Sequence, residues 1–190
     1  MNLRCLSGFT LVELAVALAV IAVVATFATP SVVVWHKRDQ IDARARMMMS
    51  TLTLARSEAI RRGARVTLCR IDAARACLAA SKACDGGSTD WSCGWGLFAD
   101  RHGARVLLRM QPTASAIAIG GTGSELSFTS PSGQVIGGFR SFDLSARDNA
   151  LKSLGVRGRR CIRLAAGGPG DARRLRNGDM KCSSRRVRRR

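Results

Sequence analysis

The chain of 190 residues lacks the side-chain arrangements from which catalytic and metal sites are built. It has two His, His36 and His102, and neither has an evident partner near a Cys, so a nucleophilic Cys is not expected. Seven, six and eight residues separate successive Cys between Cys69 and Cys93, whereas zinc sites need closer pairs. Paired carboxylates and a Gly-rich phosphate loop are also missing. We therefore expect no enzyme, no metal and no cofactor.

Acidic and aromatic side chains are scarce as well. The sequence has 13 Asp and Glu against 31 Lys and Arg, a formal net charge of +18, and it has no Tyr and only 5% aromatic residues. Such an excess of positive charge must lie on the surface, where it attracts anionic partners such as DNA or anionic lipid head groups. The length fits one globular domain of ordinary size plus an appendage.

The longest apolar run extends from Phe9 to Trp35 and would form a helix of about 40 Å, long enough to cross a bilayer. A secretory signal peptide, with Arg4 as its basic flank and a cleavage site near Ala28, is one interpretation, and a plain single-pass anchor is another. Glu13 argues against both, because a carboxylate near the start of an apolar span costs roughly 2 to 3 kcal/mol unless a partner compensates it.

The residues around this carboxylate, Gly8-Phe9-Thr10-Leu11-Val12-Glu13, resemble the class III signal of type IV pilins and type II secretion pseudopilins. In that family a prepilin peptidase cuts after the Gly and methylates the new N-terminal Phe. The resemblance implies a leader of residues 1–8, cleavage between Gly8 and Phe9, N-methylation of Phe9, and an assembly and processing role for Glu13. In a packed filament the carboxylate of one subunit can pair with the freed amine of a neighbour.

A long helix, hydrophobic and then amphipathic, is predicted over residues 9–62. Pro30 should kink or loosen it, because Pro removes a backbone donor, and Gly63 should end it. The three Met from Met47 to Met49 are interpreted as core-filling residues. One apolar stripe in the second part of the helix should pack on the following domain, and it consists of Ile41, Ala45, Met48, Leu52, Ala55 and Ala59.

Residues 63–182 change to short strand-like stretches separated by turn-rich pieces. The predicted strands are 65–71, 95–99, 104–110, 116–119, 125–129 and 160–165. Asp100 to Gly103, Ser130 to Gly133 and Asn177-Gly178 are typical of turns and hairpin connections. The predicted fold class is α+β, with the long N-terminal helix packed on a small antiparallel two-layer β domain.

Two further segments, Ala55 to Arg62 and Trp91 to Asp100, resemble the GspH/FimT group. This group contains minor pseudopilins of type II secretion systems and minor type IV pilins, which are structural proteins. The resemblance implies a single-pass protein of the bacterial inner membrane with its C-terminal domain in the periplasm. Its expected partners are the prepilin peptidase, inner membrane lipid and other pilin or pseudopilin subunits. Trp91 and Trp95 are expected to anchor the β core.

Six Cys lie beyond the hydrophobic N-terminus, an even number that suggests disulfides in an oxidising compartment. Six Cys permit fifteen pairings, and sequence does not choose among them. Proximity favours Cys69 with Cys77, Cys84 with Cys93 and Cys161 with Cys182, each of which would stabilise the fold by roughly 2 to 4 kcal/mol. Cys5 lies in the leader.

The C-terminal 39 residues, Lys152 to Arg190, carry 14 Lys or Arg and two Asp, a net charge of 14 − 2 = +12. This density suits sequence-independent, salt-sensitive contact with double-stranded DNA. Some FimT members bind DNA through a Gly-Arg-x-Arg motif, but Gly158 to Cys161 has Cys in place of its second Arg. A solvated charge cluster facing the membrane and an acidic protein partner are the alternatives. Residues 183–190 are expected to be disordered. The candidate DNA contacts are Arg157, Arg159, Arg160, Arg163, Arg173, Arg174 and Arg176.

Overall fold

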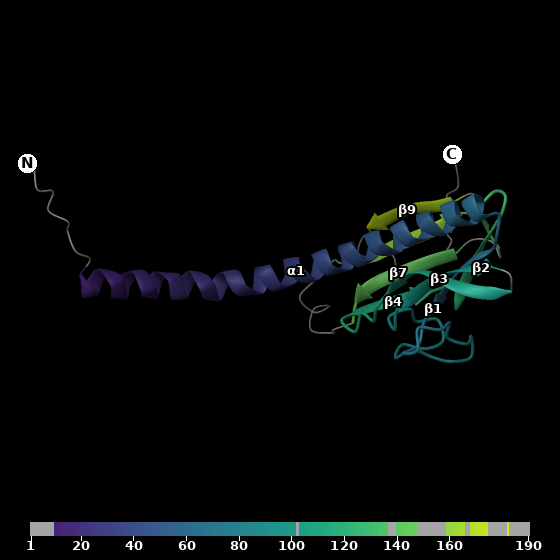
Figure 1. Ribbon diagram of the computed structural model, residues 1–190. Coiled ribbons are helices and arrows are strands. Elements are labelled where there is room, and N and C mark those ends of the chain that lie inside the picture. The colour runs from purple at the N-terminus through teal and green to yellow at the C-terminus, as the bar shows by residue number, and fades with distance from the viewer. Residues whose placement is uncertain are drawn as a thin grey trace, which may run out of the picture. The chain divides into compact units, whose positions relative to one another are not determined.

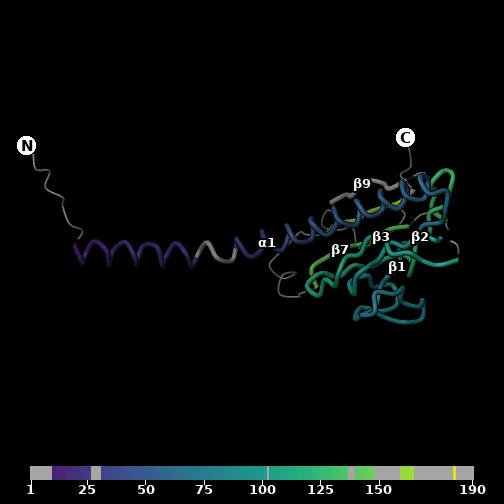
Figure 2. The backbone as a smooth tube through the Cα atoms, viewed as in Figure 1, coloured from purple at the N-terminus to yellow at the C-terminus, as the bar shows by residue number. Residues whose placement is uncertain are grey.

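The computed structural model describes residues 10–101, 103–136, 140–147, 159–165, 168–174 and 182. The chain divides into two compact units, Met1–His36 and Lys37–Arg190. The helix α1, Leu11–Arg62, begins in the first unit and ends in the second. Figure 2 traces the same path along the Cα atoms. The leader, the Asn177-Gly178 turn and the C-terminal residues 183–190 lie outside the described residues.

In the first unit α1 is apolar on all sides, and its described side chains are almost all exposed. Among the described residues no single helix is long and apolar enough to cross a membrane, but Leu11–Thr26 and Ser31–Arg62 together meet that criterion as a bent pair. The break between these two segments contains Pro30, at which the sequence predicts a kink.

In the second unit α1 has one buried side, and the predicted stripe is confirmed. The six stripe residues from Ile41 to Ala59 are between 0% and 3% exposed. Met48 lies in this stripe, as predicted for a core-filling residue, whereas Met47 is 39% exposed. The helix ends at Arg62, and Gly63 follows with a φ of 62°, the left-handed conformation in which Gly stops a helix without a steric cost.

The first sheet has five antiparallel strands in the order β3-β2-β1-β5-β6. They are β1 (Val66–Arg70), β2 (Trp95–Arg101), β3 (Ala104–Gln111), β5 (Glu125–Thr129) and β6 (Gln134–Val135). All but β6 were predicted from the sequence. The predicted turn from Ser130 to Gly133 connects β5 to β6, and Gly133 adopts a φ of 63° there.

The second sheet has four antiparallel strands in the order β4-β7-β8-β9. They are β4 (Ile117–Gly121), β7 (Arg140–Ala146), β8 (Arg160–Ala165) and β9 (Gly168–Arg174). The sequence predicted β4 and β8 but missed β7 and β9. The α+β fold is as predicted, with both sheets antiparallel.

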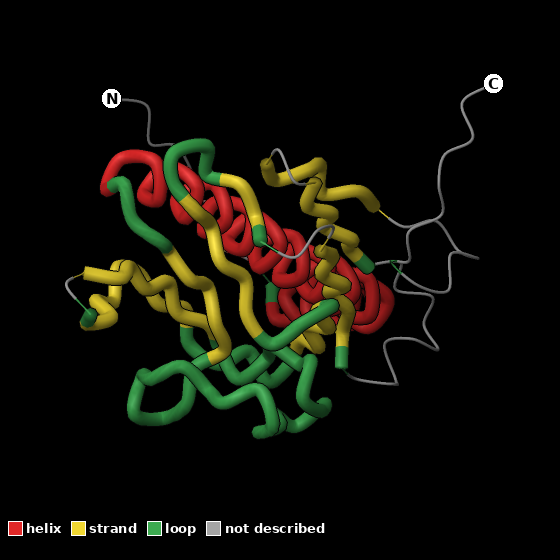
Figure 3. Tube along the Cα trace, turned by 90° about the vertical axis from the view of Figure 1, so that its right-hand side faces the viewer, coloured by secondary structure: helices red, strands yellow, loops and turns green. Residues whose placement is uncertain are grey.

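One core cluster joins the helix stripe to both sheets. Trp91 and Trp95 are 0% and 1% exposed, so their predicted role as core anchors is confirmed. The indole Nε1 of Trp91 donates a hydrogen bond to the carbonyl of Gly123, 2.8 Å away, and its ring meets the edge of Phe142 at 5.1 Å between centroids. Figure 3 shows α1 against the strands and the largest group of loops on the side away from the helix.

Candidate functional site

The first turn of α1 positions the carboxylate that the sequence singles out. The carbonyl of Thr10 accepts a hydrogen bond from the amide of Leu14, and its Oγ1 accepts one from the amide of Glu13, at 3.1 and 3.2 Å. Thr10 is therefore the N-cap, and Glu13 stands at the third helical position, the spacing of a capping box. Sequence reasoning missed this role of Thr10, although a Thr three residues before a Glu is its signature.

The carboxylate of Glu13 is exposed at the positive end of the helix dipole. It is surrounded by exposed apolar side chains, of which Leu11, Val12 and Leu14 are the nearest in sequence. A helix that is apolar all round is stable only in an apolar medium or in a bundle of other helices. The Glu13 carboxylate is therefore an anionic group within an apolar helix surface that needs an apolar medium or other helices to cover it. Gly8 and Phe9, the predicted cleavage site, lie outside the described residues.

Three disulfides join the Cys of the second unit, and they are the pairs that proximity favoured: Cys69–Cys77, Cys84–Cys93 and Cys161–Cys182. We define residues 72–92 as a lobe, which has no strand longer than an isolated bridge. Each of the first two disulfides joins one Cys inside this lobe to one just outside it. The third joins β8 to Cys182. Because each bond closes a loop in the unfolded chain, each stabilises the folded state.

A buried guanidinium holds this lobe on the first sheet. Arg70 is fully buried and donates hydrogen bonds to the carbonyls of Lys82 and Ala79, at 3.0 and 3.3 Å. Burial lowers the pKa of Arg70, and the nearby charge of Asp90 opposes that effect. Hydrogen bonds to backbone carbonyls replace the hydrogen bonds to water that Arg70 loses on burial. Arg70 therefore has a structural role in fixing the lobe.

Asp90, within the lobe, is a second buried charged residue. Burial raises its pKa, but hydrogen bonds from Ser92 and from the amide of Gly86, together with the charge of Arg147, act in the opposite direction, and the net pKa is lowered. Arg147 lies 3.3 Å from Asp90 and 3.8 Å from Asp85. Asp90 is therefore held as a carboxylate, and its partners make it a structural centre of the loops.

The candidate DNA contacts divide into four groups, one of which consists of the ion-paired Arg159 and Arg160. Arg157 and Arg176 lie outside the described residues, and Arg173 and Arg174 are described only as backbone in β9. Arg163, on β8, has an exposed side chain.

Arg159 and Arg160 form ion pairs that the sequence did not predict. Arg159 Nε donates to both carboxylate oxygens of Asp143, at 2.7 and 2.9 Å, and these hydrogen bonds raise the pKa of Arg159. Arg160 forms a two-pronged pair with Asp42 of α1. These two charges are compensated within the domain, so they add less to an anion-binding surface than the sequence suggested.

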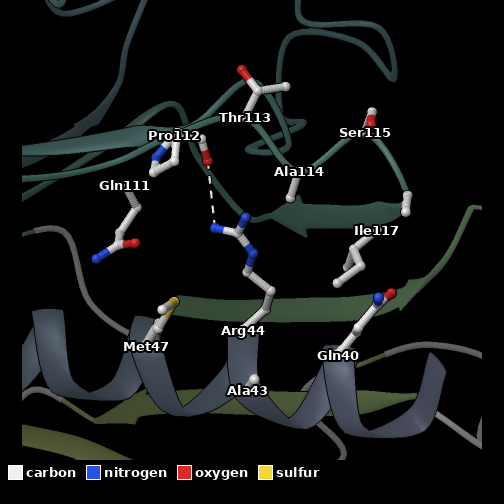
Figure 4. A pocket seen from close by; sticks show the side chains of 11 residues that line it. Gln40, Ala43, Arg44, Met47, Gln111, Pro112, Thr113, Ala114, Ser115 and Ile117 are labelled. Carbon is white, nitrogen blue, oxygen red and sulfur yellow. Dashed lines mark hydrogen bonds between the residues drawn. The ribbon is translucent and has the colours of Figure 1, made fainter. Parts of the chain in front are cut away.

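A groove of about 470 Å³ lies between α1 and the loop that joins β3 to β4. Figure 4 shows Arg44 pointing from the helix into this groove, where its Nη1 donates to the carbonyl of Pro112 at 3.4 Å. Met47 and Gln40 lie one turn to either side of it. The groove contains no carboxylate or imidazole among its lining residues, so it offers no acid–base pair for catalysis. Within the described part of the chain, no group of three metal-ligating side chains comes together.

Comparisons with known proteins agree with this architecture. The family model of the type II transport protein GspH matches residues 44–168, and the model of the prokaryotic N-terminal methylation motif matches residues 4–29. No curated protein matches the chain.

Two crystal structures of the type IV minor pilin FimU from Pseudomonas aeruginosa are similar to the chain, and both are 17% identical to it. One covers 73% of this chain and 96% of its own with a TM-score of 0.52, and the other covers 70% and 96% with a TM-score of 0.49. At this identity the likeness with the TM-score of 0.52 shows a shared fold. Because the GspH model spans more than half of the sequence and follows a methylation motif, the chain belongs to the GspH family and is a minor pilin or pseudopilin of the GspH/FimT type.

Proposed function

We propose that prepilin peptidase cleaves this chain between Gly8 and Phe9 and methylates Phe9, and that the mature chain is held in the bacterial inner membrane by a single span. The domain from Lys37 onward then lies in the periplasm. The matched methylation motif and the exposed apolar surface of α1 support this proposal. Mass spectrometry of the chain purified from its host tests it. We expect a mature chain that begins at methylated Phe9, and an intact leader would contradict the proposal.

Glu13 is the assembly residue in this proposal. Its exposed carboxylate at the start of an apolar helix is the observation that carries the function, because a lone charge there is costly in lipid or in a helix bundle. The cationic amine that cleavage creates on Phe9 of a neighbouring subunit would neutralise it. The pair would favour the incorporation of subunits that are cleaved and correctly aligned, since an uncleaved neighbour has no free amine at the start of its apolar helix.

The filament that we propose for this chain is a type IV pilus, in which it serves as a minor subunit. The net charge of +18 supports this choice, because DNA uptake by a pilus needs a cationic surface. The second candidate is a pseudopilus of type II secretion, which the description of the matched family favours. Deletion of the gene separates the two. Loss of pili with normal protein secretion would support the first, and loss of secretion with intact pili would contradict it.

Contact with DNA is the finer part of the proposal. Arg163 is exposed on β8, and backbone pairing places Arg173 and Arg174 of β9 opposite Cys161 and Arg160. Each phosphate that such a side chain neutralises releases counterions, so binding must weaken steeply with salt. Full-length protein in neutral detergent should therefore shift double-stranded DNA in a gel at low salt and release it as salt rises. Arg163→Gln should weaken the shift, and Lys82→Gln, in the lobe, is the matched control. No shift at low salt would remove DNA from the account.

A further inference from the structure

Exposed large apolar side chains are concentrated at one end of the first sheet. Among the described residues of the second unit there are five: Met47, Ile60, Val106, Leu107 and Ile136, with exposed fractions between 39% and 48%. All except Met47 belong to the end of the sheet at which α1 stops. This concentration is notable because such side chains are otherwise buried in this domain, and grouped exposed apolar residues mark interaction surfaces.

The strand register fixes this placement. Ala99, Val66, Phe128 and Val135 form one row across the sheet, because Val66 pairs with both Ala99 and Phe128, and Phe128 pairs with Val135. Three of the exposed residues adjoin this row. Val106 pairs with Ala99, Leu107 is the next residue along β3, and Ile136 follows Val135.

Ile60 reaches the same end from α1. A side chain added at Gly133, in the turn between β5 and β6, would meet Ile60 Cδ1 at 3.0 Å. The helix end therefore lies against that turn. The exposed apolar residues therefore lie at the two edges of this sheet end, with Val106 and Leu107 on β3, and Ile136 and Ile60 beside β6, while the row between them is buried.

Five arginines lie between these two edges, and we call them the arginine rim: Arg61, Arg62, Arg65, Arg101 and Arg105. Arg61 and Arg62 form the last turn of α1, and Figure 1 shows that turn at the same end as the β2–β3 connection. The carbonyl of Arg65 accepts a hydrogen bond from the amide of Asp100 at 2.9 Å.

The β2–β3 hairpin contributes the other two arginines. Arg101 pairs with Ala104, and Asp100 pairs with Arg105. Both pairs stand at the end of β2 that adjoins Arg65, so the hairpin and the helix end present their guanidinium groups at one end of the sheet.

Two carboxylates lie within ion-pair distance of these guanidinium groups. Glu58 binds both Arg61 and Arg62, and Asp100 lies 3.8 Å from Arg105. Arg65 and Arg101 have no carboxylate within ion-pair distance among the described residues. Five positive and two negative groups leave a surplus of three charges at this end of the sheet. Exposed arginines beside exposed apolar side chains are the composition of a protein interface.

We propose that the arginine rim and its flanking apolar residues dock another subunit of the filament, one that presents carboxylates around an apolar patch. This inference rests on the proposed function, since it needs a filament. A second copy of this chain does not fit, because two surfaces of a protein with net charge +18 repel each other. DNA fits less well, because phosphates leave the apolar side chains unmatched, whereas an acidic and apolar protein surface satisfies both.

The dimensions also suit a protein partner. Five strands have four gaps of about 4.8 Å, so the end of the sheet that carries the rim and the exposed apolar residues is about 19 Å wide. A specific interface buries about 800 Å² on each partner, which as a circle is about 32 Å across. This end of the sheet therefore spans somewhat more than half the width of one interface.

Site-specific photocrosslinking in the native host tests the proposal. The full chain carries p-benzoylphenylalanine at position 107 in one strain and, as a matched control, at the exposed position of Ala73 in the lobe in another. Irradiated cells should yield a discrete adduct from position 107 only. Mass spectrometry should identify its partner as a subunit with a methylation motif and a net acidic globular domain.

Charge reversal sharpens the test. Arg101→Glu with Arg105→Glu should lower the yield of the adduct about tenfold, because like charges then face the partner. Arg75→Glu with Lys82→Glu makes the same change of charge in the lobe and should leave the yield unchanged. Equal thermal unfolding midpoints of both variants exclude misfolding as the cause.

Recovery of the chain in sheared filaments separates the two proposals. If the chain is recovered but position 107 gives no adduct, or crosslinks to a second copy, the rim proposal fails and the proposed function stands. An adduct that nuclease removes would also overturn the rim proposal, in favour of DNA. If no chain enters filaments, both proposals fail.

Discussion

The two parts of α1 have the same secondary structure but opposite relations to their surroundings. In the first unit Leu18 is 58% exposed, and its apolar neighbours are exposed in the same way on every side of the helix. In the second unit Leu52 is 0% exposed, within a stripe that recurs every three or four residues. The apolar side chains of the second part are therefore covered by the domain that it belongs to. The first part needs a membrane or other subunits to cover it.

The carboxylates of the two units also differ in their surroundings. Most carboxylates among the described side chains of the second unit pair with an Arg, as Asp42, Glu58 and Asp143 do. In the first unit Glu13 is exposed among apolar side chains. The internal pairs compensate charge within the domain, whereas the counter-charge that we propose for Glu13 comes from a neighbouring subunit.

The largest effect is expected from substituting the same residue type in both parts. Leu52→Ala should lower the free energy of unfolding of the domain by about 2 to 5 kcal/mol, because it leaves a cavity under the helix. Leu18→Ala should change it by less than about 0.5 kcal/mol. Urea unfolding in mild detergent, followed by the fluorescence of Trp91 and Trp95 in a Trp35→Phe background, measures both. Equal effects would remove the distinction between the two parts.

Disulfide removal comes next in size. Cys84→Ser with Cys93→Ser should lower the free energy of unfolding by about 2 to 4 kcal/mol, because the unfolded chain regains the entropy of an open loop. The same urea titration measures the loss. Incorporation into filaments should persist at temperatures where the variant is folded, since the first unit is unchanged. Loss of incorporation by a folded variant would show that the lobe takes part in assembly.

A smaller effect separates a structural arginine from a surface one. Arg160→Gln should cost about 1 to 2 kcal/mol, because it leaves the Asp42 carboxylate without its two-pronged partner. Arg163→Gln, at an exposed position of β8, should cost less. Thermal unfolding of the two variants provides the comparison. A neutral Arg160→Gln would return Arg160 to the candidates for anion contact.

The smallest effect concerns pH. Because the folded-state pKa of Asp90 is lowered, its contribution to stability is fully present above the unfolded pKa of about 3.9 and is lost as pH falls through the lower folded value. Asp90→Asn should remove this part of the loss of stability at low pH. Above about pH 5 the difference in stability between the variant and the wild type should not change with pH. Unfolding midpoints of both proteins, measured from about pH 5 down through the folded-state pKa of Asp90, test this expectation. Identical slopes for both proteins would mean that folding does not lower the pKa of Asp90.

Much of the fold could be predicted from sequence because its signals are local. The helix stripe follows from the spacing of apolar residues, and six strands follow from short apolar stretches between turns. Strand β7 was missed although Phe142 and Leu144 alternate with polar residues, which is the pattern of a half-buried strand. Strand β9 begins Gly168-Pro169-Gly170, residues that disfavour strands, and it forms by pairing with β8.

The ionic contacts of the domain were beyond sequence reasoning. Asp42 and Arg160 are separated by 118 positions, and nothing in either neighbourhood indicates the other. The motif around Glu13 could be recognised because its residues are contiguous. The arginine rim could not, because its members come from the helix end, a loop and a hairpin that only the folded sheet brings together.

The pairing of Glu13 with a neighbouring subunit is tested by the amount of Glu13→Ala chain recovered in filaments sheared from the host. Glu125→Ala, which removes an exposed carboxylate from β5, is the matched control. We expect Glu13→Ala to be nearly absent from filaments while it remains in the membrane, and Glu125→Ala to be incorporated like wild type. Equal recovery of all three proteins would contradict the claim that Glu13 pairs with the cut end of a neighbouring subunit.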